Sequence, residues 1–151
     1  MNDNLDISEH RLEERQSVTK IIKFFEEERD FNKVIYTEWT SKDILGHIVF
    51  WHESFARNVL SVIENTRSNL IKGTLAEANE RGVKEMSKYS IEELLDKLRI
   101  AQIKIDLNIE NKDIRTIKYR QGSREYTPIE HLDLVKNHLE KHLEDMKKKY
   151  R

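Results

Sequence analysis

Apolar residues recur along most of this chain with the spacing of amphipathic α-helices, and polar stretches without that period separate them. Long helices are expected over residues 41–64, 91–109 and 128–151, after a first helix over residues 8–29. The predicted inner face of the first helix consists of Leu12, Val18, Ile21, Ile22 and Phe25. The pattern predicts an all-α protein, a four-helix bundle that occupies residues 1–151 as a single domain.

Residues that satisfy the free backbone amides of a first helical turn stand before the last three of these helices. They are Thr40 with Asp43, Ser90 with Glu93, and Thr127 with Pro128 and Glu130. A hydroxyl followed by an acid three residues later has the spacing of a capping box, and proline suits the first helical position. These patterns mark the predicted helix starts.

The two remaining connections differ in character. A long crossover joins the second and third long helices, and residues 75–86 within it read as a short helix. Between the last two helices, the period changes over residues 114–126 around Gln121 and Gly122, which predicts a loop or a short hairpin.

The composition excludes several classes of protein. The chain has no Cys, so a catalytic metal would need His and carboxylate ligands. Lys plus Arg (27) and Asp plus Glu (28) nearly balance, which argues against nucleic-acid binding through bulk charge. No apolar run approaches the ~20 residues of a membrane helix, and the polar N-terminus lacks the features of a secretory signal. We therefore expect a cytoplasmic protein that binds neither nucleic acid nor membrane.

Three of the six histidines fall on the inward face of the last helix. On a helical wheel, His131, His138 and His142 lie within ~40° of one another, beside the apolar stripe. His138 and His142 are one turn apart, the spacing at which a helix supplies two imidazoles to one metal ion. His131 lies ~10 Å further back along the axis, too far to share that ion easily. It is expected to face a substrate or to cap the core.

A third ligand has to come from another helix, and His47 is the natural candidate at the edge of the apolar stripe of residues 41–64. Asp43, one turn earlier, is a candidate to orient the His47 ring, although capping is its simpler role. His52 points elsewhere, and core packing explains His52 and His131 more simply than ligation. Because His pairs four apart arise by chance in roughly one such chain in five, spacing alone leaves both a metal site and an ordinary core open.

Two stretches of the chain resemble the DinB/YfiT-like superfamily. Residues 39–48 (WTSKDILGHI), followed by Trp51, are similar to its second-helix signature, and residues 138–143 (HLEKHL) to its fourth-helix motif. The segment from Ala78 to Leu95 is similar to the ClbS/DfsB-like branch. The resemblance covers most of the chain from Trp39 onward.

This resemblance implies a four-helix bundle, often a homodimer, with a divalent metal held by His47, His138 and His142. Members of the superfamily include transferases and isomerases that depend on bacterial low-molecular-weight thiols, and the ClbS/DfsB-like branch includes a protein that detoxifies a reactive metabolite. The implied cofactors are a divalent ion (zinc, nickel or manganese) and a low-molecular-weight thiol.

Two functions are consistent with these patterns. The first is a metal-dependent enzyme of the hydrolase or S-transferase type, acting on a small electrophilic metabolite between the second and last long helices. Three neutral imidazoles would leave such an ion its full charge and an open position. The second is a non-catalytic bundle without metal, which binds a metabolite or has a structural role. Trp39, Trp51 and Phe55 are interpreted as core residues, not as a platform for stacking bases.

Overall fold

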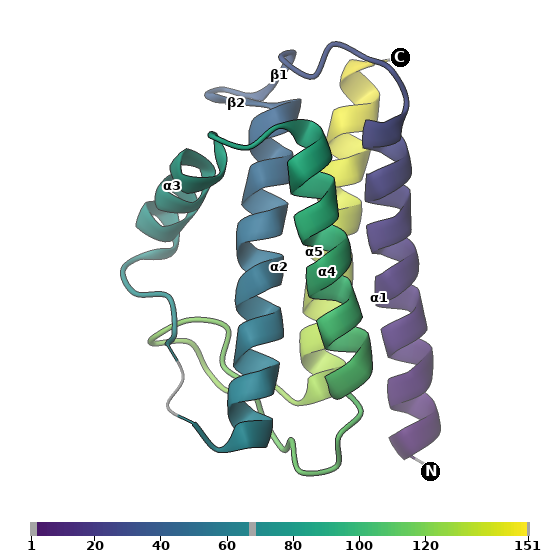
Figure 1. The fold of residues 1–151 in the computed structure, drawn as a ribbon, viewed down its shortest axis with the longest axis vertical. Helices are drawn as coiled ribbons and strands as arrows, with labels where there is room; N and C mark the ends of the chain where they lie inside the picture. Colours follow the sequence, from purple (N-terminus) through teal and green to yellow (C-terminus); the bar gives the residue numbers. More distant parts are fainter. Residues whose placement is uncertain (1–2, 67–68, 151) are drawn as a thin grey trace.

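The structure, a computed structural model, describes the backbone of residues 3–66 and 69–150, and side chains from residue 7 onward within those ranges. Long helices run side by side and form a bundle (Figure 1): α1 (Asp3–Glu26), α2 (Ser41–Glu64), α4 (Ile91–Asn108) and α5 (Pro128–Lys149). The predicted all-α four-helix bundle is therefore confirmed. The first helix begins and ends earlier than the predicted range 8–29.

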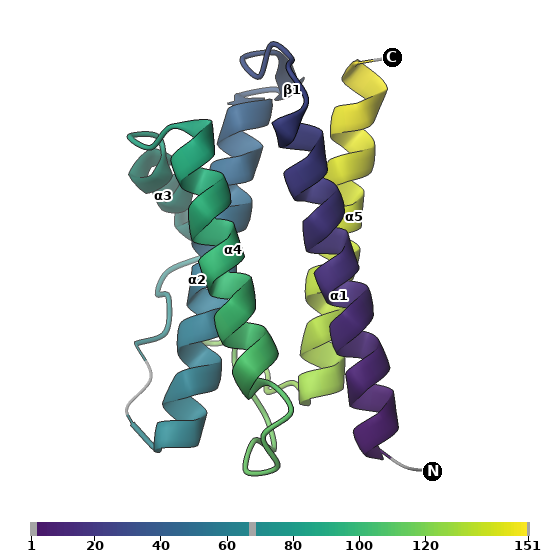
Figure 2. The ribbon, with the colours of Figure 1, turned by 45° about the vertical axis from the view of Figure 1, so that its right-hand side comes forward.

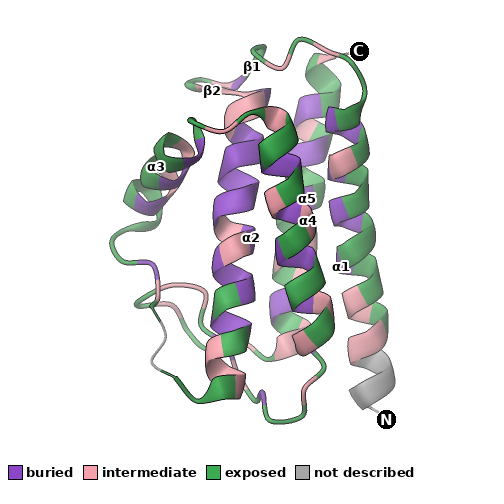
Figure 3. Cartoon of the chain, in the orientation of Figure 1, coloured by how far each residue is buried: buried purple, intermediate pink, exposed green. Residues whose placement is uncertain are grey.

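The long helices are arranged as two close pairs. α1 packs mainly against α5 and α2 mainly against α4, whereas α2 and α5 approach each other less closely. Figure 2 shows the two pairs with a wider interval between them. α2 is nevertheless buried along most of its length (Figure 3), and some of its polar side chains, such as His47, His52 and Asn58, lie inside the protein. Within the described residues, no helix combines the length and the hydropathy needed to cross a membrane.

Capping boxes open α2, α4 and α5 as predicted. The hydroxyls of Thr40, Ser90 and Thr127 each accept the backbone N–H of an acidic residue three positions later, whose side chain accepts the N–H of the cap in return. A further box at Thr74 opens α3 (Leu75–Met86), the short helix predicted in the crossover. These caps depend on residues that are close in sequence, which explains why the pattern locates the helix starts.

The short helix α3 packs directly against α2, and two glycines allow this approach. A Cβ atom on Gly82 would lie 2.5 Å from Cδ2 of Phe50. A Cβ atom on Gly46 would lie 3.0 Å from Cβ of Met86. Because carbon atoms in contact prefer separations of ~3.5–4.0 Å, larger residues at these positions would push the helices apart. The crossover therefore covers one side of α2.

Two short paired segments carry aromatic residues toward the bundle. β1 (Val34–Tyr36) and β2 (Trp39–Thr40) form an antiparallel pair between α1 and α2, which the sequence pattern did not predict. Ile117 and Tyr126 exchange two backbone hydrogen bonds of 2.7 and 2.9 Å. This bridge confirms the loop or short hairpin predicted for residues 114–126.

The predicted inner face of α1 is wrong at one position. Val18 and Ile21 are buried, but Leu12 is 39% exposed. At that level Glu14 is buried instead, because α1 meets α4 there through a hydrogen bond from Gln102 to the Glu14 carboxyl group. A polar contact between helices thus takes the place of the apolar contact that the helical period predicted.

Candidate metal centre

The three histidines predicted as ligands meet at one point between α2 and α5. The Nε2 atom of His138 lies 2.8 Å from Nε2 of His142 and 3.2 Å from Nε2 of His47. One ligand nitrogen from each ring lies within 4.8 Å of the other two. The fold therefore brings together two residues of one helix and a residue 91 positions away on another.

The donor set suits a divalent ion, and two of its three nitrogen separations are close to those in a zinc site. Two imidazole nitrogens ~2.0–2.1 Å from zinc are about 3.4 Å apart at a tetrahedral angle and about 3 Å apart at a right angle. The separations of 2.8 and 3.2 Å differ from these values by a few tenths of an ångström. Ligation of a metal by His47, His138 and His142 stays a prediction, to which this geometry adds support.

Burial keeps the imidazoles in the form that a metal requires. Burial, with the neighbouring His138 and His142, lowers the pKa of His47 to about 2. Burial and His138 likewise lower the pKa of His142 to about 3. The surrounding protein also lowers the pKa of His138, although that side chain is exposed. Neutral rings near pH 7 carry a nitrogen lone pair, and a metal binds that lone pair.

The prediction that His131, His138 and His142 all face inward needs one correction. His131 and His142 are buried, whereas His138 is exposed. The reason is that the His138 side chain contacts His47 of α2 on one side and lines a cavity between α2 and α5 on the other. Its exposure leaves the centre accessible to small molecules.

Tyr36 and Asp145 determine which nitrogen of His142 carries the proton. The Tyr36 hydroxyl donates to Oδ2 of Asp145 at 2.7 Å and lies 2.9 Å from Nδ1 of His142. Burial and the Asp145 bond raise the pKa of Tyr36, so the hydroxyl keeps its single hydrogen. Nδ1 of His142 must therefore donate to the tyrosine oxygen, and Nε2 keeps its lone pair toward the other two rings.

The candidate role of Asp43 in orienting His47 is not what the structure shows. The Asp43 carboxylate accepts the backbone N–H of Thr40 at 3.0 Å, which is the capping role. Nδ1 of His47 is buried and has no hydrogen-bond partner among the described residues. The Trp39 ring packs against His47 with centroids 4.9 Å apart, so aromatic contact holds this ring on one side.

A cavity of about 330 Å³ adjoins the three histidines. Residues of α2 and α5 form much of its wall, together with aromatic residues of the two short paired segments. Phe55 is buried, as predicted for a core residue, but Trp39 and Trp51 are only partly buried and line the cavity. His52 and His131 are buried, as the core interpretation predicts, and both also line the cavity.

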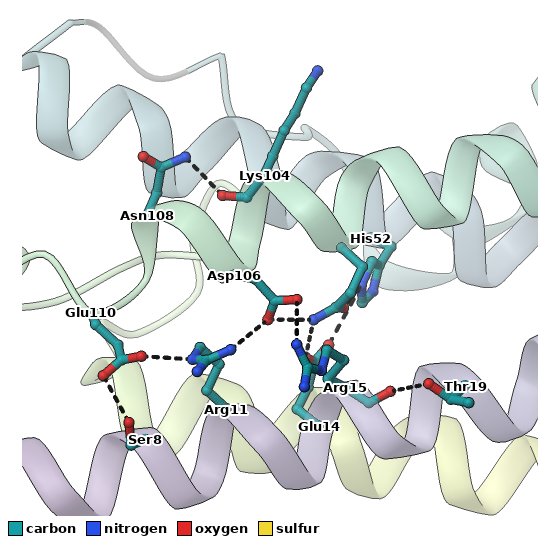
Figure 4. A network of polar contacts seen from close by, with 11 residues as sticks. Ser8, Arg11, Glu14, Arg15, Thr19, His52, Lys104, Asp106, Asn108 and Glu110 are labelled. Carbon is teal, nitrogen blue, oxygen red and sulfur yellow. Dashed lines mark hydrogen bonds and ion pairs between the residues drawn. The ribbon is translucent and has the colours of Figure 1, made fainter.

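His52 connects the cavity to a buried polar network that the sequence pattern did not reveal (Figure 4). Its Nε2 lies 2.7 Å from Oε1 of Gln102 and 3.5 Å from Oε1 of Glu14. The amide nitrogen of Gln102 donates to Glu14 at 2.8 Å and to Asp106 at 3.1 Å. Gln102 therefore accepts a hydrogen from His52 and donates two to the acids. Asp106 pairs with Arg11 at the surface end of the network.

The acid at the centre of this network is held in its neutral form. Burial raises the pKa of Glu14 to about 8, and the hydrogen bond from Gln102 only partly opposes that effect. Burial also lowers the pKa of His52 to about 4. Near pH 7 the pair is thus a protonated carboxyl group beside a neutral imidazole, which avoids two buried charges.

No family model matches the chain, and no curated protein matches it. A solved structure, the crystal structure of the mycothiol-dependent maleylpyruvate isomerase, resembles it with a TM-score of 0.76. That protein has a DinB/YfiT-like helical fold. The chain has a DinB/YfiT-like fold. The resemblance noted in the sequence is thereby confirmed at the level of the fold.

The match to the isomerase structure covers 96% of this chain but only 63% of the isomerase chain, and the two sequences are 12% identical. A histidine-to-alanine mutant of the same isomerase matches with the same coverage and identity and a TM-score of 0.74. Identity this low establishes the DinB/YfiT-like fold alone. Function has to be argued from the site itself.

Proposed function

We propose that this chain is a divalent-metal-dependent enzyme of the thiol-dependent S-transferase or hydrolase type, acting on a small electrophilic metabolite. The observation that carries the proposal is the convergence of three neutral imidazoles, from α2 and α5, at the wall of a cavity of about 330 Å³. A volume of this size is within the range of small-molecule sites. An exposed His138 beside two buried ligands provides access.

The residues around the triad have definable tasks in such an enzyme. A divalent ion held by His47, His138 and His142 would lower the pKa of a bound water or thiol and supply positive charge to the reacting group. The Tyr36 and Asp145 pair holds the His142 ring in the tautomer that binds metal. Trp39 shields one side of His47 from water.

The thiol-dependent type is favoured by two facts. The chain has no Cys, so a thiol nucleophile has to come from a separate molecule. The solved structure with the same fold is named a mycothiol-dependent enzyme. A low-molecular-weight thiol is therefore our proposed cosubstrate.

Metal loading and turnover of an untagged sample test the proposal. Zinc, nickel or manganese at 100-fold excess over its Kd should stabilise the fold by about 2.7 kcal/mol, which raises the Tm by roughly 5–10 °C at 2–4 °C per kcal/mol. The loaded protein should accelerate the reaction of glutathione with 1-chloro-2,4-dinitrobenzene or the hydrolysis of an activated ester. If the metal changes neither the Tm nor these rates, the proposal is wrong.

The second candidate function is a metabolite-binding bundle without metal. One observation favours it: Nε2 atoms 2.8 and 3.2 Å apart lie at distances where neutral imidazoles can hydrogen-bond directly. This function predicts that small molecules stabilise the protein while divalent ions do not.

The cytoplasmic location and the homodimer expected from the resemblance are also kept as proposals. The dimer is tested by sedimentation equilibrium, in which a monomer has the chain mass of 18.1 kDa. A mass of one chain at micromolar concentration would contradict it.

A further inference from the structure

We propose that the ligand of this cavity has an uncharged, largely aromatic body and one neutral hydrogen-bonding group that reaches His131. It carries at most one anionic group, at the end beside the three histidines, and no carboxylate elsewhere. The inference rests on the proposed function in taking this ligand to be the substrate, whose reacting end lies beside His47, His138 and His142. It states which part of the ligand the rest of the cavity binds, which the metal chemistry leaves undefined.

The first support is the size and lining of the cavity. A cavity of ~150 Å³ lined by apolar side chains holds one benzene molecule. The cavity beside the triad, at about 330 Å³, has room for a body of about two fused rings. Aromatic side chains of Trp39, Trp51, Phe55, Tyr119 and Tyr126 contribute to its wall. Flat rings pack against such walls in stacked or edge-on contacts.

The entrance to the cavity is apolar as well. Leu75 at the start of α3 and Leu134 of α5 line the cavity, yet they are 45% and 40% exposed. Exposed aliphatic groups at a binding site favour an apolar ligand, which covers them on binding. A strongly hydrated ligand would gain nothing from these contacts.

The second support is the absence of counter-charge. Among the described residues that line the cavity, none is Lys, Arg, Asp or Glu. Arg120 and Arg124 stack on the rings of Tyr119 and Tyr126 and do not line the cavity. Arg124 also pairs with Glu130.

An unpaired carboxylate placed in such a cavity loses hydration without gaining a partner. The N-terminus of α5, the other feature that could attract an anion, already has its Glu130 carboxylate as a cap. One anionic group is tolerated at the triad, where a divalent ion would neutralise it. A second carboxylate elsewhere in the cavity is not.

The third support is an unused polar side chain. His131 is 2% exposed, and neither of its ring nitrogens has a hydrogen-bond partner among the described residues. Its ring stacks on Phe55 with centroids 4.1 Å apart, and burial lowers its pKa to about 4. His131 is thus a neutral donor and acceptor in the wall, and an unpaired buried polar group costs ~1–3 kcal/mol. A ligand group that pairs with it recovers part of that cost.

The position of His131 sets the length of the ligand. It precedes His138 by seven residues on α5, which corresponds to ~10 Å along the helix axis. A ligand that reacts beside the triad and pairs with His131 must therefore have polar groups at opposite ends of a rigid body. A naphthalene ring substituted at positions 2 and 6 has this arrangement.

Calorimetric titration of the metal-free protein with three naphthalenes tests the inference. We expect 2-naphthol to bind, and 2,6-naphthalenedicarboxylate to bind about 100-fold more weakly or worse because both of its charges are uncompensated. The second hydroxyl of 2,6-dihydroxynaphthalene should tighten binding about fivefold to tenfold through His131. His131→Phe keeps the stacking on Phe55 and should abolish that gain. His10→Phe, the same substitution at a histidine outside the cavity, is the matched control.

Two results would overturn the inference without any variant. Binding of the dicarboxylate within tenfold of 2-naphthol is one, and failure of both naphthols to bind at millimolar concentration is another. An undiminished second-hydroxyl gain in folded His131→Phe would remove the role of His131. Failure of the proposed function is a different result: the naphthols bind as expected while the protein takes up no divalent ion.

Discussion

Replacing Glu14 by Gln is expected to stabilise the protein above neutral pH, the reverse of what most substitutions of a buried residue do. The folded chain holds the Glu14 carboxyl group with a pKa of about 8, raised from 4.5 by burial. The unfolded chain releases this proton near its ordinary pKa. Between these two values the folded state binds one more proton than the unfolded state. Stability therefore falls as the pH rises through this window, and it is greatest below it.

The size of the effect follows from the same pKa values. One proton difference changes the free energy of unfolding by ~1.36 kcal/mol per pH unit. Near pH 8 the folded carboxyl group starts to ionise, so the contribution of Glu14 alone falls by roughly 1 kcal/mol between pH 7 and pH 8. His52, with a folded pKa lowered to about 4, and the four other histidines whose pKa burial lowers make opposite contributions. These contributions are not yet complete at pH 7, because an unfolded histidine has a pKa of ~6.5. Glu14→Gln keeps all of these histidines, so the difference between the variant and the parent chain isolates Glu14.

Urea denaturation of metal-free protein at pH 5.5, 7 and 8 measures this dependence. Glu14→Gln resembles the protonated acid and cannot ionise, so its stability should rise by roughly 1 kcal/mol relative to that of the parent chain between pH 7 and pH 8. Glu13→Gln is the matched control, since Glu13 is exposed and its pKa is lowered by Lys136, so it is ionised throughout this range. A Glu14→Gln variant whose stability changes by the same amount as that of the parent between pH 7 and pH 8 would refute the reasoning.

Three further changes test other parts of the structure. Tyr36→Phe removes the acceptor for Nδ1 of His142 and should weaken zinc binding, measured by calorimetry, about 10–100-fold. The helical circular dichroism signal should not change. An unchanged zinc affinity would show that the hydroxyl does not orient the ring. His138→Ala should abolish uptake of metal while the helical signal persists, because this side chain is exposed; global unfolding would instead make the residue structural. Gly82→Ala places a methyl group 2.5 Å from a Phe50 ring atom and should cost about 1–3 kcal/mol in urea denaturation; a neutral effect would contradict the close packing of α2 and α3.

The parts of the fold that depend on neighbouring residues could be predicted from the sequence. The caps at Thr40, Ser90 and Thr127 join atoms three residues apart, so the pattern that predicts them is local. The wheel positions of His47 and the pair on α5 also follow from helical geometry, provided that α2 and α5 face each other.

The parts that depend on distant residues could not be predicted in this way. Tyr36 lies 106 residues from His142, on a strand too short to have a periodic signal. The burial of Glu14, where the helical period predicted burial of Leu12, depends on a hydrogen bond from Gln102. No pattern in the sequence indicates this contact. Asp145 is the exception, because an acid three residues after a candidate ligand histidine is a recognisable neighbour.

X-ray absorption at the zinc edge, on untagged zinc-loaded protein, tests the central claim most directly. The account predicts one ion per chain with three imidazole nitrogens at ~2.0–2.1 Å, and loss of that signal in His138→Ala. A zinc shell without histidine scattering, or the same spectrum in the variant, would show that His47, His138 and His142 do not hold the ion.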